Sequence, residues 1–363
     1  MTEALPPSTE TLPYETVLAS QFREHRQCSK FAGKVAMVGF GKMGALHATI
    51  LKMLNPESTI TAVDESKLVR AGGSTFLKGV RFYGDLDKML AKEHPDAAYV
   101  TAPAFAHYDL LSKLADSSIG SLFVEKPPTK DSMQLSRLVD SVGRRSVVMV
   151  GLQKRFALPF RHLKHLIDTG VLGTVQAVEA SIKSGDVLSE TTRFDALGRG
   201  CMLDLGIHVV DLINWLFAGV NVVRVSASSI FTHLDDAVNV QFRDERGTDI
   251  ILDVSWSSKD VRWPSAKVRI VASDAVVEAS EDMLSVRPIG GEERIISKPA
   301  YYGDSTAVNL ADPEYTYEDM HFLCCVNAGR EPETSLRACK STMTLIDEIY
   351  SKIQIGHSDT SRR

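Results

Sequence analysis

The glycine-rich segment at residues 39–44 constrains the fold of this chain more than any other feature. It follows the apolar run 35–38 directly, residues 45–54 after it favour a helix, and its six residues are Gly39, Phe40, Gly41, Lys42, Met43 and Gly44. A strand, a GxGxxG turn and a helix in this order are typical of a dinucleotide-binding βαβ unit. Gly39 permits the tight turn, Gly41 lets the backbone approach a pyrophosphate, and Gly44 lets the helix pack closely on the strand. The pyrophosphate is then expected at the N-terminus of the helix.

An acidic residue stands where such a unit needs one. Asp64 lies twenty residues after Gly44, at the end of the apolar run 59–63. A carboxylate at this place accepts hydrogen bonds from the ribose 2′-hydroxyl and repels a 2′-phosphate, so we expect NAD as the cofactor. Lys67 and Arg70 follow within two turns and could weaken the preference for NAD, so NADP stays a possible cofactor.

Composition excludes several functional classes. With a formal net charge of −5 over 363 residues, the chain has no basic excess with which to bind nucleic acid. No apolar run is long enough to span a bilayer, and residues 1–13 do not make a secretory signal. The five cysteines are scattered without metal-ligand spacing, which favours reduced thiols in the cytoplasm and no bound metal. His162 and His165 share a helix with basic neighbours and are expected at the surface.

The order of the expected elements indicates two domains with an appendage at each end. Residues 1–32 are expected to form an appendage, in which residues 14–28 could be a helix; the alternative is a disordered or loosely packed arm. In residues 33–152, strand-like and helix-like stretches alternate, which predicts a parallel sheet. Residues 153–335 contain consecutive strand-like runs without helices between them, which predicts an α+β domain with a mostly antiparallel sheet. Residues 336–363 are expected to contain a helix that packs back on the body.

The second sheet also suggests self-association. Apolar residues crowd one region of the expected strands, namely Val238, Val240, Phe242, Ile250, Leu252, Val254 and Trp256. A sheet with helices on one face only leaves the other face partly apolar, and such a patch usually marks an interface. We therefore expect a homodimer or a homotetramer.

Residues that follow the parallel strands are the candidates for the reaction site, because ligands of such sheets bind at the carboxyl ends of the strands. Thr101, Ala102, Pro103 and then His107 follow one strand-like run. Glu125 and Lys126 follow the next, and Pro127 rigidifies that loop. From the local sequence alone, Lys126 is either functional or a solvated charge at a strand end.

An aspartate and a histidine form the second candidate group. Asp204 and His208 are four residues apart on an expected helix, so they share one face and can form a hydrogen bond. Such a pair orients the imidazole and stabilises its cation, which suits a general base. A structural histidine with a satisfied ring is the alternative.

Together these motifs resemble the Gfo/Idh/MocA oxidoreductases, a family that includes glucose–fructose oxidoreductase and inositol dehydrogenase. The resemblance covers residue 34 to the end, and it rests on residues 39–44, 125–127, 204–208 with 211–212, 155–173 and 329–332. Residues 101–104 read Thr-Ala-Pro-Ala where the family often has Thr-Pro-Asn, and the first 30 residues have no counterpart. Neither departure touches the expected catalytic residues.

The resemblance implies an α/β Rossmann domain with a doubly wound parallel sheet, followed by an α+β domain with a large, mostly antiparallel open sheet. It implies NAD(P)-dependent interconversion of a secondary alcohol and a ketone on a sugar, cyclitol or related polyol. Lys126, Asp204 and His208 take the catalytic positions: His208 would remove the hydroxyl proton, Asp204 would orient His208, and Lys126 would stabilise the alkoxide. The cofactor would contact residues 39–44, Asp64, Thr101, Ala102, Pro103, His107, Glu125 and Lys126. The substrate would contact Gln153, Arg155, Lys183, Asp186 and Arg193.

Several alternatives stay open at this point. An enzyme of this fold could use bound NAD for a transient oxidation that leads to glycosidic cleavage, or could reduce a ketone or imine in biosynthesis. A non-catalytic cofactor-binding regulator would have lost the catalytic residues, whereas Lys126, Asp204 and His208 are all present. We expect a neutral polyol as substrate, although Arg155, Arg193 and Arg199 could receive a phosphate, a carboxylate or a nucleotide diphosphate.

Overall fold

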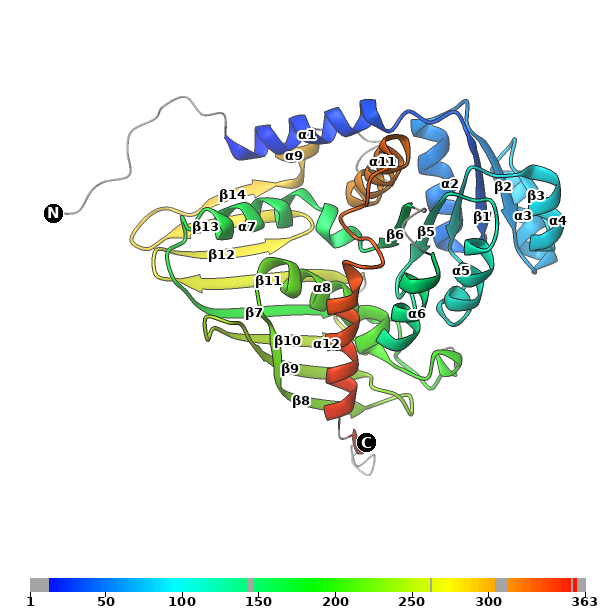
Figure 1. Ribbon diagram of the computed structural model, residues 1–363. Helices are drawn as coiled ribbons and strands as arrows, with labels where there is room; N and C mark the ends of the chain where they lie inside the picture. The colour runs from blue at the N-terminus through cyan, green and yellow to red at the C-terminus, as the bar shows by residue number, and fades with distance from the viewer. Residues whose placement is uncertain are drawn as a thin grey trace.

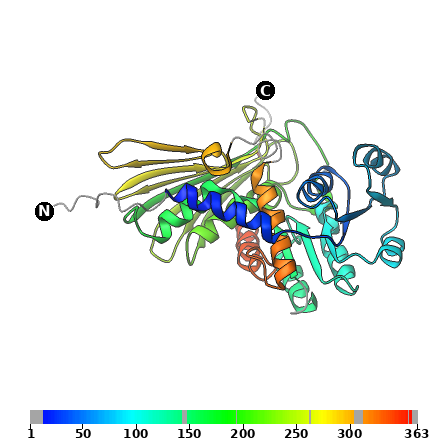
Figure 2. The same cartoon turned by 90° about the horizontal axis from the view of Figure 1, so that it is seen from above.

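Two sheets lie side by side in the computed structural model, each with its own helices (Figures 1 and 2). The structure describes residues 13–142, 147–192, 194–261, 263–303, 312–353 and 355–357. Within this part of the chain no helix combines the length and the apolar character that crossing a bilayer requires.

The first sheet is parallel and has six strands in the order β3-β2-β1-β4-β5-β6. In chain order its elements are β1 (Lys34–Val38), α2 (Lys42–Leu54), β2 (Thr59–Val63), α3 (Lys67–Phe76), β3 (Arg81–Tyr83), α4 (Leu86–Glu93), β4 (Ala97–Val100), α5 (His107–Ala115), β5 (Ser121–Glu125), α6 (Ser132–Val142) and β6 (Val147–Gly151). Strands β4 and β5 are buried along their whole length, as expected of strands covered by helices on both faces. The predicted Rossmann domain is confirmed.

The second sheet has nine strands in the order β14-β13-β12-β11-β7-β10-β9-β8-β15. They are β7 (Val175–Lys183), β8 (Asn221–Ser229), β9 (Ala237–Arg243), β10 (Asp249–Ser255), β11 (Ser265–Ala272), β12 (Ala275–Ser280), β13 (Met283–Pro288), β14 (Arg294–Ser297) and β15 (Ile355–His357). Only the pairs β7–β10 and β8–β15 are parallel. The predicted large, mostly antiparallel sheet is therefore confirmed.

Helices cover one face of this second sheet. They include α7 (Leu158–Asp168), α8 (Ile207–Leu216) and α12 (Cys339–Lys352), which lie in front of the strands in Figure 1. The short helix α9 (Lys298–Tyr302) follows β14, and α11 (Pro313–Ala328) lies between the two sheets. The view from above shows the opposite face of the sheet without a helix on it (Figure 2).

The apolar residues that suggested an interface lie on the covered face. Val240 and Phe242 of β9 and Ile250 and Leu252 of β10 have no exposed surface, because strand alternation turns them toward the helices. Val238, Val254 and Trp256 are buried with them. That part of the argument for oligomerisation is wrong, since these side chains already form the core of the subunit.

The N-terminal arm is an ordered helix where the structure describes it. Helix α1 (Tyr14–Cys28) buries Leu18, Ala19 and Phe22, and Phe22 packs edge-on against Tyr302 and Tyr317. The helix expected over residues 14–28 is confirmed, and the alternative of a loose arm is wrong for them, because their apolar face has partners on α9 and α11. His162, expected at the surface, is buried beneath this region with its Nδ1 3.0 Å from the Tyr301 hydroxyl oxygen.

A disulfide joins Cys28, at the end of α1, to Cys324 in α11. The expectation that all five cysteines are reduced is therefore contradicted, whereas Cys201, Cys325 and Cys339 are free and buried. The two bonded residues are 296 positions apart, so no local spacing could have revealed the pair.

Candidate active site

A cavity of about 1880 Å³ runs along the carboxyl ends of the parallel strands and is lined from both domains. From the first domain it receives the glycine turn, Asp64 and the ends of β4 and β5. From the second it receives Asp186, Asp204, His208 and residues near β11, β12 and α11. The cavity thus has a cofactor half and a half on the side of the second domain, which we call the substrate end.

The glycine turn has the shape that a dinucleotide needs. A Cβ on Gly39, whose φ is +93°, would lie 2.5 Å from the backbone nitrogen of Ala102. A Cβ on Gly44 would lie 2.3 Å from the Gly39 carbonyl oxygen, so this glycine lets α2 approach β1. At Gly41 a Cβ would meet no atom within 4 Å, and this residue lines the cavity. The open space beside Gly41, at the N-terminus of α2, fits a pyrophosphate.

The other residues of the turn divide between the cavity and the core. Lys42 and Met43 line the cavity, whereas Phe40 is buried and packs edge-on against Phe82. The backbone N–H of Phe40 donates to Asp64 Oδ2 at 2.8 Å, and the N–H of Ser66 donates to Oδ1 at 2.8 Å. Asp64 is therefore fixed at the cavity wall. Arg70 donates to the backbone oxygens of Asp64 and Glu65.

Residues 101–107 form the neighbouring wall. Thr101, Ala102 and Pro103 line the cavity, and the Thr101 hydroxyl donates to the Gly39 carbonyl oxygen at 2.6 Å. His107 lies behind this wall and is 1% exposed. Its Nδ1 is 2.7 Å from the Pro127 carbonyl oxygen and its Nε2 2.8 Å from that of Ala102, so it ties the two loops together.

Lys126 and Asp204 meet across the cavity. The Lys126 Nζ donates to the backbone oxygen of Asp204 at 2.6 Å and to its Oδ1 at 3.1 Å. Both side chains keep some exposure, 20% for Lys126 and 34% for Asp204, so they remain accessible to a ligand. This contact joins the end of β5 to the π-helical turn Met202–Gly206 that precedes α8.

His208 lines the same cavity but does not bond to Asp204. Its ring is buried, and its Nδ1 has no hydrogen-bond partner among the described residues. The predicted Asp204–His208 bond is therefore absent: the helix widens into a π turn at residues 202–206, and the carboxylate of Asp204 accepts from Lys126 instead. Burial, with the nearby cations of Lys126 and Lys154, lowers the pKa of His208 well below its usual value. The imidazole is thus neutral and able to accept a proton.

A buried histidine that the sequence analysis did not single out supports this centre. His47, on α2, has its Nδ1 2.9 Å from Asp319 Oδ1 and its Nε2 3.1 Å from Glu125 Oε1. Burial alone would lower the pKa of His47, but the two carboxylates raise it well above its usual value. Glu125 Oε2 in turn accepts the backbone N–H of Lys126 at 3.1 Å. The residue before Lys126 is thereby fixed from two helices, α2 and α11.

The predicted substrate residues separate into two groups. Gln153 and Asp186 line the cavity, and Gln153 Nε2 donates to the Tyr315 hydroxyl at 2.9 Å. Arg155 is buried in a two-pronged ion pair with Asp211, with both contacts at 2.6 Å. Arg155 does not line the cavity, so the prediction that it binds substrate is contradicted. Arg193 lies outside the described residues.

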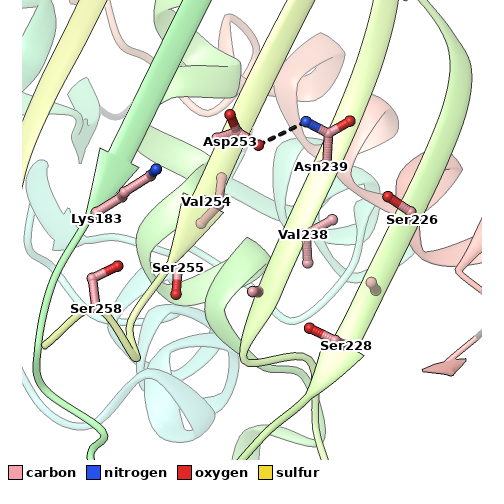
Figure 3. A pocket seen from close by; sticks show the side chains of 11 residues that line it. Lys183, Ser226, Ser228, Val238, Asn239, Asp253, Val254, Ser255 and Ser258 are labelled. Carbon is pink, nitrogen blue, oxygen red and sulfur yellow. Dashed lines mark hydrogen bonds between the residues drawn. The ribbon is translucent and has the colours of Figure 1, made fainter. Parts of the chain in front are cut away.

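Lys183 belongs to a different surface. It lines a hollow of about 440 Å³ on the uncovered face of the nine-stranded sheet, with Ser226, Asn239 and Asp253 (Figure 3). Asn239 donates to Asp253 at 2.7 Å within this hollow. The prediction that Lys183 binds the substrate is therefore wrong, because the strand turns its side chain away from the catalytic cavity.

Further residues of the substrate end were missed, because they come from distant segments. Lys154, Glu281, Glu314 and Tyr315 all line the cavity, as does Trp263, whose ring lies 5.6 Å from the Lys42 Nζ across the cavity. Neither their spacing nor their residue types form a local motif. Glu281 follows β12 and Glu314 lies in the first turn of α11, so only the folded chain brings them to Lys154.

Comparisons with known proteins agree with this geometry. Residues 33–152 match the family described as "Oxidoreductase family, NAD-binding Rossmann fold" (GFO_IDH_MocA), and residues 160–278 match the GFO/IDH/MocA C-terminal domain. A D-apiose dehydrogenase of Paraburkholderia graminis is 23% identical over 335 residues, which are 90% of this chain and 88% of that protein. An inositol 2-dehydrogenase/D-chiro-inositol 3-dehydrogenase of Lacticaseibacillus casei is 28% identical over 50% of this chain, which spans 52% of that enzyme.

Solved structures share the fold at low sequence identity. A levoglucosan dehydrogenase in complex with NADH and levoglucosan has a TM-score of 0.77 and 16% identity, over 88% of this chain and 96% of that one. An oxidoreductase from Agrobacterium radiobacter in complex with NAD+, L-tartaric acid and magnesium has a TM-score of 0.74 and 19% identity, over 89% and 96% of the two chains. The matching domain and these neighbours identify an NAD-binding oxidoreductase fold.

Two glycine substitutions should separate folding from cofactor binding. Gly44→Ala forces a Cβ against the Gly39 carbonyl oxygen, so it should cost about 1–3 kcal/mol of stability. Gly41→Ala meets no protein atom, and φ at Gly41 is −72°, so the melting temperature without cofactor should stay unchanged. Gly41→Ala should nevertheless weaken NAD binding by about tenfold or more, because the methyl group enters the space for the pyrophosphate. Thermal unfolding and calorimetric titration with NAD measure both effects. Unimpaired NAD binding by Gly41→Ala would contradict the assignment.

Proposed function

The chain belongs to the Gfo/Idh/MocA oxidoreductase family, and from this premise we propose that it interconverts a secondary alcohol and a ketone on a sugar, cyclitol or related polyol with NAD. The family and the fold make it an NAD-binding oxidoreductase of the sugar or inositol dehydrogenase type. The specific substrate, the preference for NAD over NADP and the roles of single residues belong to the proposal.

The observation that carries the proposal is the pairing of a neutral imidazole with an ammonium group on one cavity. His208 comes from the second domain and has a lowered pKa, while Lys126 comes from the first. A neutral imidazole can take the proton of a hydroxyl group, and the Lys126 ammonium stabilises the negative charge that then develops on the oxygen. NAD, when bound, supplies the hydride acceptor for the oxidation.

Asp204 has a different role in this proposal from the one expected from the sequence. Its backbone oxygen and its Oδ1 both accept from the Lys126 ammonium, which positions that group. Asp204 therefore acts on the orientation of Lys126, and His208 stays neutral, which leaves its imidazole able to accept a proton.

The relatives support a sugar or cyclitol as the substrate class. D-apiose dehydrogenase and inositol dehydrogenases are among them, and levoglucosan dehydrogenase shares the fold. Two of the three arginines that could have bound an anion are engaged elsewhere, since Arg155 pairs with Asp211 and Arg199 with Asp347. Enzymes that use bound NAD for transient oxidation release no NADH, which separates that alternative from net oxidation. A biosynthetic reductase would instead consume NADH.

Self-association and location complete the proposal. The uncovered face of the nine-stranded sheet carries the half-buried Ile251 and Val271, so we place the interface of a homodimer or homotetramer there. Light scattering that returns a stable monomer would contradict this.

We also propose a cytoplasmic location, and the Cys28–Cys324 disulfide is the observation that opposes it, because disulfides are rare in that compartment.

The proposed chemistry is tested with Lys126→Met and His208→Ala. Each should lower kcat by about 10²- to 10⁴-fold, because each removes a positioned proton acceptor or charge stabiliser. The assay follows NADH absorbance with inositols, free hexoses, aminocyclitols, hexose phosphates and nucleotide-linked sugars as substrates. Unchanged melting temperatures would show that the variants fold. If either variant keeps a near-normal kcat with the best substrate, the role given to that residue is wrong.

Cofactor preference is tested at Asp64. The native protein should have the higher kcat/KM with NAD, because the carboxylate faces the place of the ribose hydroxyls and repels a 2′-phosphate. Asp64→Ala should narrow the ratio between NAD and NADP, with the NAD value falling. Steady-state kinetics with both cofactors decide the point, and equal or better efficiency of the native protein with NADP would refute the assignment.

A further inference from the structure

Carboxylates outnumber cations at the substrate end of the cavity. Among the described residues, the charged side chains that line it comprise three lysines and six acids, namely Lys126, Lys154, Lys298, Asp186, Asp204, Glu281, Asp282, Asp312 and Glu314. No described arginine lines the cavity. This end therefore carries an excess of negative charge that favours a cation.

The three lysines are already paired with acids. Lys126 bonds to Asp204 at 3.1 Å, and Lys298 lies 3.1 Å from Asp282. Lys154 Nζ lies 2.5 Å from Glu281 Oε1. The same Glu281 oxygen accepts the backbone N–H of Ala266 at 2.8 Å. Glu281 Oε2 accepts from the Ser265 hydroxyl at 2.9 Å, so both oxygens of Glu281 have donors and Lys154 neutralises its charge.

Glu314 is the acid with the weakest such pairing, and one of its carboxylate oxygens has no partner. Its side chain is only 3% exposed, and its Oε2 accepts no hydrogen bond. Its Oε1 lies 3.9 Å from Lys154, beyond hydrogen-bond distance. A buried carboxylate oxygen without a donor is costly, and the Glu314 side chain lies on the cavity wall. A donor from the substrate would satisfy it.

Glu314 shares the Lys154 ammonium with the reaction centre. Lys154 lies 3.9 Å from Glu314 Oε1 and is also one of the two cations that lower the pKa of His208, while the neighbouring Tyr315 hydroxyl accepts from Gln153. Glu314 and His208 therefore line the same cavity and are both influenced by Lys154. Asp186, whose Oδ2 accepts from the Ser184 hydroxyl, also lines this cavity and has no cation within ion-pair distance among the described residues.

We propose that the substrate is an amine-bearing polyol, an aminocyclitol or amino sugar, whose ammonium group is bound by Glu314. The inference rests on the proposed dehydrogenase function and narrows its substrate class. An ammonium group supplies three N–H donors and a positive charge, which match an unpartnered carboxylate better than a hydroxyl does. Burial raises the pKa of Glu314 to about 7, partly offset by Lys154, and a bound ammonium would favour the ionised form.

The same charges act against anionic substrates. A phosphate or a carboxylate would meet Glu314, Asp186 and Asp282, and each lysine at the substrate end already pairs with an acid. Repulsion between these carboxylates and the negative charge of the substrate opposes binding. Sugar phosphates, uronates and nucleotide-linked sugars should therefore be poor substrates.

The test compares isosteric substrate pairs with the NAD-loaded full chain. The pairs are scyllo-inosamine with scyllo-inositol and D-glucosamine with D-glucose, and D-glucuronate is the anionic comparison. For at least one pair, kcat/KM for the amine should exceed that for the hydroxyl compound by about tenfold or more, the scale of a hydrogen bond to a charged group. Glu314→Gln keeps the shape and removes the charge, so it should lower kcat/KM more for the amine than for the hydroxyl compound and bring this ratio to about one.

Two further variants complete the design. Asp186→Asn should lower the same ratio, and it replaces Glu314→Gln if that variant fails to fold. Glu278→Gln, on the uncovered face of the same sheet and paired with Arg269, is the matched control and should leave the ratio unchanged. The shift in melting temperature that each compound causes in the NADH-loaded protein gives a readout that does not depend on turnover.

The outcomes separate this inference from the proposed function. Turnover of hydroxyl or anionic compounds in preference to amines would overturn the inference while leaving the dehydrogenase intact, as would an equal effect of Glu314→Gln on both members of a pair. Amines that stabilise the protein in a Glu314-dependent way, without any NADH formation, would support the inference and contradict the proposed function. Absence of both stabilisation and turnover with every amine would overturn the inference as well.

Discussion

A continuous line of hydrogen bonds, from Asp319 through His47, Glu125 and Lys126 to Asp204, holds the two halves of the active site together. Glu125 is its central member, because one carboxylate oxygen faces His47 and the other accepts the backbone N–H of Lys126. His47 is fully buried between two carboxylates, and the loss of His47, Glu125 or Asp319 would leave a buried charge without its partner. This line connects α11, α2, the end of β5 and the π turn before α8, so the position of the Lys126 ammonium is fixed from four elements.

The same arrangement sets the charge state of His208. The imidazole is buried, it lies near two ammonium groups, and its predicted acidic partner is bound to Lys126 instead. Each of these facts disfavours the imidazolium. Oxidation of an alcohol requires two groups of this kind. One is a base that is neutral before the reaction, and the other is an ammonium group that is charged throughout. The excess of acids at the substrate end of the cavity then influences which alcohol binds there.

The parts that the sequence predicted are those encoded by local pattern. The glycine turn, Asp64 and the residues after β4 and β5 follow from strand–turn–helix order, and all but Phe40, Gly44 and His107 line the cavity. Side-chain direction was harder to predict. Lys183 and Asp186 are three residues apart, yet one lines the uncovered face of the sheet and the other the cavity. Gln153 and Arg155 share one short turn, but Arg155 has a buried partner, Asp211, 56 positions away.

Long-range partners account for the remaining differences. The sequence of residues 14–28 allows a helix to be predicted, but it does not indicate that Cys324 and Tyr317 contact it. Nothing in the sequence around Glu314 indicates that it lies beside Lys154 with one carboxylate oxygen lacking a hydrogen bond. That property depends on the positions of donors from distant segments in the folded chain. The π turn likewise depends on packing, and it broke the expected Asp204–His208 pair.

The pH dependence of kcat/KM for oxidation of a neutral polyol tests the central claim most directly. Because His208 must be neutral to accept the proton and its pKa is lowered in the folded protein, activity should persist as the pH falls through 6.5 and be lost only below it. Lys154→Met should move this acid limb to higher pH, since it removes one of the two cations that lower the pKa. An acid limb at or above pH 6.5 in the native protein would contradict the account, because the proton acceptor would then not be an imidazole held neutral by burial and by Lys126.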